Sequence, residues 1–237
     1  MQREQLRRHG VFAGVIAVAV LATLIAAVTA RERSGRETVR ASGERASASY
    51  DLSGFEAVHL RGGYDLALVA GKEPAIEISG DKAILEALEV RVADGRLEIG
   101  PRDGQRFCDS DGVALMIHLP KLRAITVDGV VDGKLATLDS EEFALTINGA
   151  ADMTLSGSCG TFSAVTNGAG DIDARDFHCQ SASVTVNAAG DMRIYASRSI
   201  TAAVNGVGSI DIYGNPPEVR KLRAGIGSIR LRHADAS

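Results

Sequence analysis

Four aspartates recur at nearly even intervals in the second half of the chain, and together they could do chemistry. They are Asp132, Asp152, Asp171 and Asp191. Stacked on neighbouring strands about 4.8 Å apart, their carboxylates would repel one another unless protonated, solvated or bridged by a cation. Such oxygen ligands suit Ca²⁺, and paired carboxylates at this spacing suit a retaining glycosidase. The structural alternative, which we favour, is that Asp and Asn recur at corners because they hydrogen-bond local backbone.

Two further sets of polar or reactive side chains follow the same interval. Stacked asparagines would form a hydrogen-bonded ladder, and the set comprises Asn148, Asn167, Asn187 and Asn205. Cys159 and Cys179 each stand eight residues before one of these asparagines. This placement predicts that the two cysteines lie side by side on neighbouring strands, within disulfide range. We expect them to form a disulfide in an oxidising compartment. Cys108 has no evident partner, and two stacked thiols are the alternative for the pair.

Motifs of established enzyme classes are missing from the sequence. We find no P-loop, no dinucleotide fingerprint and no serine-hydrolase elbow, and the five histidines show no metal-ligand spacing. The sequence therefore predicts neither an enzyme nor a cofactor, with calcium at the aspartates as the open alternative. Net charge is −4, aromatic residues make up 4 % and Trp is absent. Nucleic-acid binding is excluded because basic charge and stacking platforms are both lacking.

The elements that would position these residues follow from a repeated phrase, Asn-Gly followed by small residues and then Asp or Ser. Its copies begin at residues 128, 148, 167, 187, 205 and 224. Apolar residues alternate with polar ones on both sides of each copy, which indicates strands with one buried face. One such repeat cannot bury its own apolar face, so copies must stack. We therefore predict an all-β fold, a right-handed parallel β-helix (solenoid) with coils of about 19 residues.

One column of the repeat is expected to point outward and to alternate in charge. A salt-bridge ladder between neighbouring strands is the preferred interpretation, and a charged stripe for a ligand is the alternative. The column comprises Thr154, Asp173, Arg193, Asp211 and Arg230.

The N-terminus has the layout of a secretory signal or a membrane anchor. Arg3, Arg7 and Arg8 precede an uncharged stretch from Val11 to Val28, and a small-residue site ends at residue 30. The apolar run, expected to be helical, is also long enough to span a bilayer. Both alternatives place the remainder outside the cytoplasm, in the periplasm or at the cell surface. We expect residues 1–30 to be this segment, 31–50 a flexible linker and 51–233 the β-solenoid.

Several short motifs, in this order, resemble the bacterial head GIN domain family of putative auto-transporter adhesins. They are Phe55 with Val58, residues 64–66, 76–81 and 94–99, the Pro120 region, the repeats, and the closing residues 214–217 and 225–229. The resemblance covers roughly residues 55–232 and implies a β-helical domain of the cell envelope without an established active site. No catalytic residues carry over.

Three functional hypotheses follow. The preferred one is a non-enzymatic adhesin-like module or scaffold that binds an envelope glycan or protein through its flat faces. The second is a carbohydrate-active enzyme that uses the stacked aspartates. The third is a self-assembling envelope protein, a homo-oligomer joined end to end. Contact with a membrane is expected only through the N-terminal segment.

Overall fold

Alternation of buried and exposed residues continues through most strands of the computed structural model, which describes residues 37–107 and 112–232. The chain divides into two units, Met1–Glu37 and Thr38–Ser237, and the second contains nearly all described residues. In β11 (Ile172–Val186), for example, Ala182, Val184 and Val186 are buried and alternate with the more exposed Ser183 and Thr185. The period of two is that of a strand with one apolar face.

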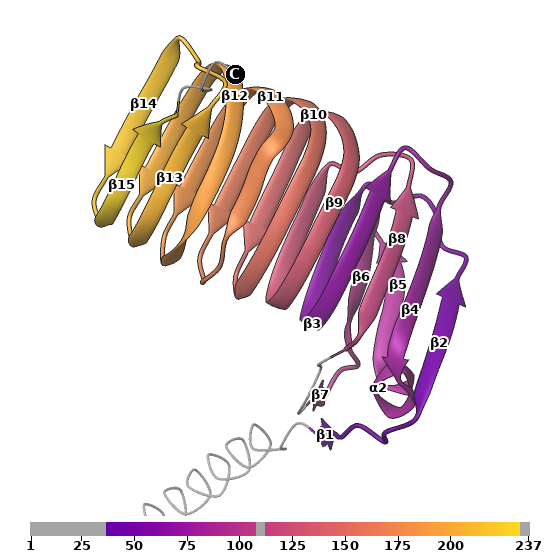
Figure 1. The fold of residues 1–237 in the computed structure, drawn as a ribbon. Helices are drawn as coiled ribbons and strands as arrows, with labels where there is room; N and C mark the ends of the chain where they lie inside the picture. Colours follow the sequence, from indigo (N-terminus) through magenta and orange to yellow (C-terminus); the bar gives the residue numbers. More distant parts are fainter. Residues whose placement is uncertain (1–36, 108–111, 233–237) are drawn as a thin grey trace, which may run out of the picture. The chain divides into compact units, whose positions relative to one another are not determined.

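Parallel pairing joins the strands of the C-terminal part (Figure 1). These strands are β9 (Ala124–Ile147), β10 (Ala150–Thr166), β11, β12 (Ala189–Val204), β13 (Val207–Tyr213), β14 (Glu218–Arg223) and β15 (Ile226–Leu231). Each residue lies beside its counterpart in the next copy of the phrase. The apolar alternation predicted beside the phrase is confirmed. Its residues pair across the strands to form a continuous column, which runs through Met153, Ile172, Met192, Ile210 and Ile229.

The N-terminal part contains both strand directions. Its elements are β1 (Glu37–Val39), β2 (Arg45–Tyr50), β3 (Ala57–Ala70), β4 (Ala75–Asp81), α2 (Lys82–Glu86), β5 (Leu88–Ala93), β6 (Arg96–Pro101), β7 (Gln105–Phe107) and β8 (Ala114–Leu119). β4 is antiparallel to both β2 and β8. β5 and β6 form an antiparallel hairpin across Asp94 and Gly95, whose positive φ angles of 49° and 72° suit a tight hairpin turn. β3 pairs in parallel with β9 on one side and with β6 and β8 on the other.

The prediction of a right-handed parallel β-helix was therefore wrong. Thirteen strands form one large mixed sheet with antiparallel pairs, β1 and β7 form a separate two-stranded sheet, and no closed solenoid is present in the described residues. Apolar alternation identifies strands and their buried faces but carries no information on the direction of the partner strand, which explains the error.

The N-terminal elements also differ from those expected. The apolar helix expected at Val11–Val28 lies outside the described residues. Within residues 37–107 and 112–232, no helix has the length and hydropathy needed to cross a bilayer. Residues 45–50, expected to belong to a linker, form β2 and pair with β4.

Three phenylalanines, one each from β9, β10 and β11, pack against one another in the core. Phe143, Phe162 and Phe177 are each 1 % exposed. Phe143 stacks on Phe162 with ring centroids 5.9 Å apart, and Phe177 meets both rings edge-on at 5.5 and 5.4 Å. Such edge-to-face pairs are favourable because the positive ring edge meets the negative ring face.

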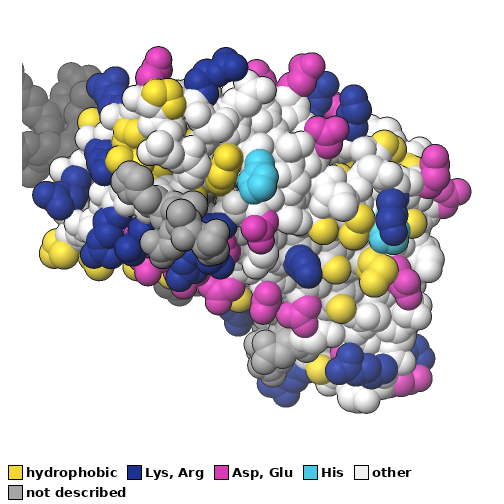
Figure 2. All heavy atoms as spheres, turned by 45° about the horizontal axis from the view of Figure 1, so that its top comes forward, with side chains coloured by type: hydrophobic (Ala, Val, Ile, Leu, Met, Phe, Trp, Pro, Cys, Tyr) yellow, Lys and Arg dark blue, Asp and Glu magenta, His cyan; other side chains and the backbone are white. Residues whose placement is uncertain are grey.

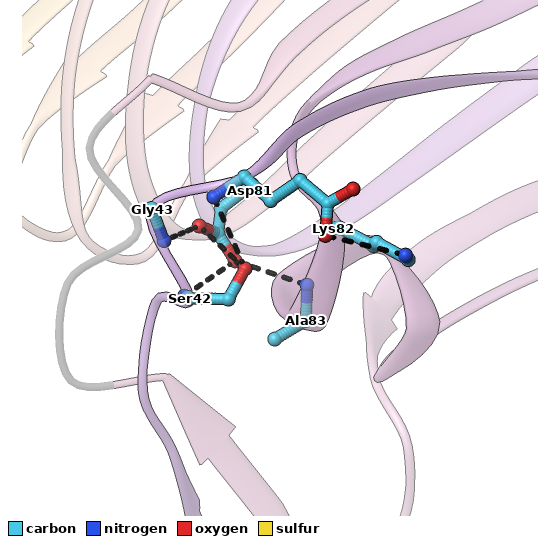
Figure 3. Close-up of polar contacts among 6 residues, drawn as sticks. Ser42, Gly43, Asp81, Lys82 and Ala83 are labelled. Atoms are coloured by element: carbon cyan, nitrogen blue, oxygen red, sulfur yellow. Dashed lines mark hydrogen bonds and ion pairs between the residues drawn. The ribbon is translucent and has the colours of Figure 1, made fainter.

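A single carboxylate holds the chain segment that precedes β2 (Figure 3). Asp81 accepts hydrogen bonds from the backbone N–H groups of Ser42 (2.9 Å), Gly43 (2.6 Å) and Ala83 (3.0 Å) and from the Ser42 hydroxyl. It is also the N-cap of α2. These donors, led by the Ser42 N–H, lower the pKa of Asp81 from 3.8 to about 2.

We predict that acid releases this segment. Because the folded pKa of Asp81 is lowered, its stabilising effect is complete above pH 3.8 and is lost as the pH falls through about 2. NMR titration should show the Ser42 and Gly43 amides shifting together in that window. In Asp81→Asn the same amides should show no transition there. Amides of wild-type protein that shift only with global unfolding would contradict the prediction.

We also predict a conformational and steric requirement for glycine at position 190. Gly190 has φ +148°, and a Cβ there would collide with the carbonyl oxygen of Gly170. Gly71 has φ +81° with open space around it, so Gly71→Ala isolates the dihedral cost. We expect Gly190→Ala to lose about 1–3 kcal/mol more than Gly71→Ala in urea unfolding, because overpacking adds to strain. Equal losses would show that the close strand approach is unimportant.

Candidate ligand-binding surface

A continuous chain of side-chain hydrogen bonds crosses the strands and confirms the predicted asparagine ladder. Each Nδ2 donates to the Oδ1 of the preceding member at 2.8 Å, in the order Asn205, Asn187, Asn167 and Asn148. Asn148 then donates to Oδ1 of Asp128 at 2.6 Å, and Oδ2 of Asp128 lies 2.6 Å from Nε2 of His59. The hydrogen bond from Asn148, followed by that from His59, lowers the pKa of Asp128. The ladder thus ends on an anion.

We call the four recurring aspartates the aspartate column, and three of them accept hydrogen bonds from backbone N–H groups of the next repeat. Oδ1 of Asp152 accepts the N–H of Asp171, and Oδ1 of Asp171 accepts the N–H of Asp191, both at 3.0 Å. Asp191 accepts the N–H and hydroxyl of Ser209 at 2.7 Å. Asp132 pairs with Asp152 in register. These contacts differ from the expected bonds to local backbone, since the acceptors reach one strand further.

The same column was the candidate calcium site. Within residues 37–107 and 112–232, no three His, Cys, Asp or Glu side chains are grouped so that they could hold a metal ion. Asp152, Asp171 and Asp191 each use one carboxylate oxygen to accept a backbone N–H. A calcium site at these aspartates stays a prediction from the sequence.

Cys159 and Cys179 lie directly opposite each other on β10 and β11. They are joined as a disulfide, with Cα atoms 4.4 Å apart. The bridge closes a loop of one repeat and links two strands that are already paired, with both residues mostly buried. Cys108 lies outside the described residues.

The outward column of alternating charge is present, but its closest ion pairs lie elsewhere. Asp173 faces Arg193, and Asp211 faces Arg230 in the strand register. Nevertheless Asp173 binds Arg175 at 2.6 Å, whereas Arg193 is 4.0 Å away. The hydrogen bond from Arg175 lowers the pKa of Asp173. Exposed pairs of this kind contribute about 0–1 kcal/mol each, so the column offers polar groups to solvent more than it stabilises the fold.

Beside this column lies a group of rings that sequence analysis missed, which we call the aromatic strip: His178, Tyr195 and Tyr213. The rings of His178 and Tyr195 have centroids 4.5 Å apart, and Tyr195 pairs in register with Tyr213. His178 is exposed and the tyrosines are partly exposed. The signal was available, because the two tyrosines are separated by 18 residues, one repeat length.

Two open hollows lie over the N-terminal half of the sheet. One, of about 610 Å³, is lined mostly by loop residues that include Phe55, Pro74 and Pro120. The other, of about 570 Å³, lies over β3, β4, β8 and β9 and brings Asp65 and Asp132 near Lys134. Asp152, Asp171 and Asp191 do not line either hollow. The aspartate column therefore does not form one acidic cleft.

Residues 54–216 match the family described as putative auto-transporter adhesin, head GIN domain, and the chain belongs to this family. The resemblance inferred from the sequence motifs is thereby confirmed. No curated protein matches the chain.

Among solved structures, a putative adhesin from Bacteroides fragilis has the same fold. It is 20 % identical, covers 82 % of this chain and 100 % of its own, and has a TM-score of 0.64. A putative lipid binding protein and a putative adhesin, both from Parabacteroides distasonis, are 17 % and 16 % identical. Each covers 83 % of this chain and 100 % of its own, with a TM-score of 0.48.

We predict one free thiol per chain, that of Cys108, when the protein is titrated under denaturing, non-reducing conditions. The chain has three cysteines, and the disulfide removes two. After reduction, the same titration should give three. Three thiols before reduction would contradict the bridge, and Cys108→Ser, which should give none, controls for incorrect pairing.

Proposed function

We propose that this domain is a non-enzymatic, adhesin-like binding module or scaffold of the cell envelope, and that it holds a glycan or protein ligand on the outward face of its sheet. Membership of a family described as adhesins supports the general role. The observation that carries the ligand surface is the aromatic strip beside the charged column. Together they place exposed rings next to hydrogen-bonding groups on paired strands.

The chemistry of the strip suits such a ligand. Tyr and His rings offer an apolar face with a polar edge, so they can pack on a sugar ring or an aliphatic side chain while hydrogen-bonding at the rim. Asp173 and Arg193 beside them supply acceptors and donors. Because the underlying strands are fixed by continuous ladders, little conformational entropy is lost when a ligand binds.

The non-enzymatic assignment rests on what the aspartates contact. Hydrolysis of a glycoside requires one protonated and one ionised carboxyl group, both free to reach the substrate. Asp152, Asp171 and Asp191 each accept a backbone N–H from the next strand. They lie in a file across the sheet, outside the two hollows described above.

A location outside the cytoplasm agrees with this role. The family description suggests the envelope or cell surface, and a disulfide persists in an oxidising compartment. The N-terminal segment would then be either a removed signal or an anchor in the inner membrane.

We predict that Tyr195→Ala weakens ligand binding by tenfold or more. Removing a ring at the centre of an interface commonly costs more than about 1.4 kcal/mol, which is tenfold in Kd. Binding would be measured on a glycan array and on immobilised extracellular-matrix proteins, with hits quantified by calorimetry. Val130→Ala is the control, since Val130 is 62 % exposed on a different strand, β9, and lines neither hollow. Equal affinity of Tyr195→Ala and wild type for every hit, or no hit on either array, would refute the proposal.

A further inference from the structure

The sheet ends at β14 and β15 with charged residues where earlier strands have buried apolar ones. Lys221 pairs with Ala202, and Arg223 pairs with Val204. Ala202 and Val204 are both 0 % exposed, whereas Lys221 and Arg223 are exposed. The last copy of the repeat therefore interrupts two columns of the core.

Both cations are hydrogen-bonded to backbone carbonyl groups of the last strand. Nζ of Lys221 donates to the carbonyl oxygen of Ile229 at 3.1 Å, and Nη1 of Arg223 donates to that of Gly227 at 3.3 Å. Both bonds run from β14 to β15. A further strand from a second copy would bury both charges, which is unfavourable, and charged edge strands are a common protection against such pairing. The end of the sheet is thus closed to extension.

The same end concentrates positive charge on a chain whose net charge is −4. We define the cationic end as the five basic residues of 218–232: Arg220, Lys221, Arg223, Arg230 and Arg232. The only acidic residue in this range is Glu218. In the described part of the chain, Arg232 alone among the five pairs with a carboxylate, at 2.9 Å from Asp211. Figure 2 shows blue basic side chains gathered at the left of the view, where β14 and β15 lie.

Large apolar side chains are exposed among these cations. Ile226 is 78 % exposed, Leu222 44 % and Leu231 38 %. Ile226 belongs to a column that pairs through Val207, which is itself 57 % exposed. Leu222, Ile226 and Leu231 thus share β14 and β15 with Lys and Arg residues. Exposed aliphatic groups together with cations match the boundary between anionic headgroups and acyl chains.

We propose that the cationic end docks on the surface of an anionic phospholipid bilayer. This goes beyond the proposed ligand-binding role and uses different residues, on β14 and β15. Positive charge complements anionic headgroups, and Leu222, Ile226 and Leu231 enter the interface. A soluble polyanion would use the cations but leave the three aliphatic side chains in water, so the combination favours a bilayer.

The chain contains no Trp, so Ile226→Trp introduces a single reporter at the cationic end. In the full-length protein, its fluorescence should shift to shorter wavelength with phosphatidylglycerol-containing vesicles and be quenched by brominated lipid. Vesicles of phosphatidylcholine alone should cause neither change, which separates the cationic end from any membrane insertion by the N-terminal segment. Rising ionic strength should weaken the response because salt screens exposed charges.

Val130→Trp is the matched control. Val130 is 62 % exposed and belongs to the same column as Ile226, through Ala150, Ala169, Ala189 and Val207. It lies on β9, away from the cationic end. Its tryptophan should therefore not respond to anionic vesicles.

Charge variants in the Ile226→Trp background test the electrostatic part. Arg220→Gln with Arg230→Gln should weaken vesicle binding about 30-fold, since each Lys or Arg near an anionic surface contributes about fivefold. Lys72→Gln with Arg96→Gln removes the same charge from exposed positions elsewhere and should have little effect.

Three results would overturn the proposal. One is an absent response of Ile226→Trp to anionic vesicles, or an equal response to neutral ones. Another is a response to soluble polyphosphate without a response to vesicles, which would indicate a polyanion site. The third is concentration-dependent self-association that shifts the fluorescence without lipid, which would indicate a second copy.

Discussion

The C-terminal part of the structure depends on one constraint: its parallel strands pair so that equivalent residues of successive repeats lie side by side. Each residue lies beside its counterpart 17 to 20 positions away. A side chain that occurs at the same position in successive copies of the phrase must therefore be compatible with its own neighbour. Asparagines satisfy this by donating to one another, aspartates by accepting the neighbouring backbone N–H, and cysteines by bonding covalently. A like-charged column without such partners would repel itself.

Features that repeat could be predicted from the sequence, since repetition reveals which residues share an environment. The apolar column through Met153 and Ile172 and the asparagine ladder both followed from counting intervals. Strand direction could not be predicted in this way. Residues 75–101 show clear alternation, yet β4 and β5 run antiparallel to their partners. Alternation has the same period in both sheet types, so the direction is decided by packing between distant segments.

The candidate surface was harder to predict than the fold, because its parts do not repeat throughout. The rings of the aromatic strip come from three strands, and His178 reaches Tyr195 only where the register of β11 and β12 shifts between Ala174 and Cys179. This irregularity interrupts the repeat near His178, so only the two tyrosines, one repeat length apart, could have been found from the sequence. The alternating charges were visible in the sequence, but the closest partner of Asp173 is Arg175, two residues along its own strand.

The disulfide changes how the chain responds when it is pulled from its C-terminal end. Force applied at the C-terminal end acts first on β15, β14 and β13, and non-covalent contacts alone, backbone hydrogen bonds and buried side chains among them, resist their separation from the preceding strands. These strands can peel off in turn, and β12 can follow from β11. Peeling then meets the covalent link between β11 and β10. The bridge then carries the force directly from Cys179 to Cys159, so residues 160–178 cannot be extended until a covalent bond breaks.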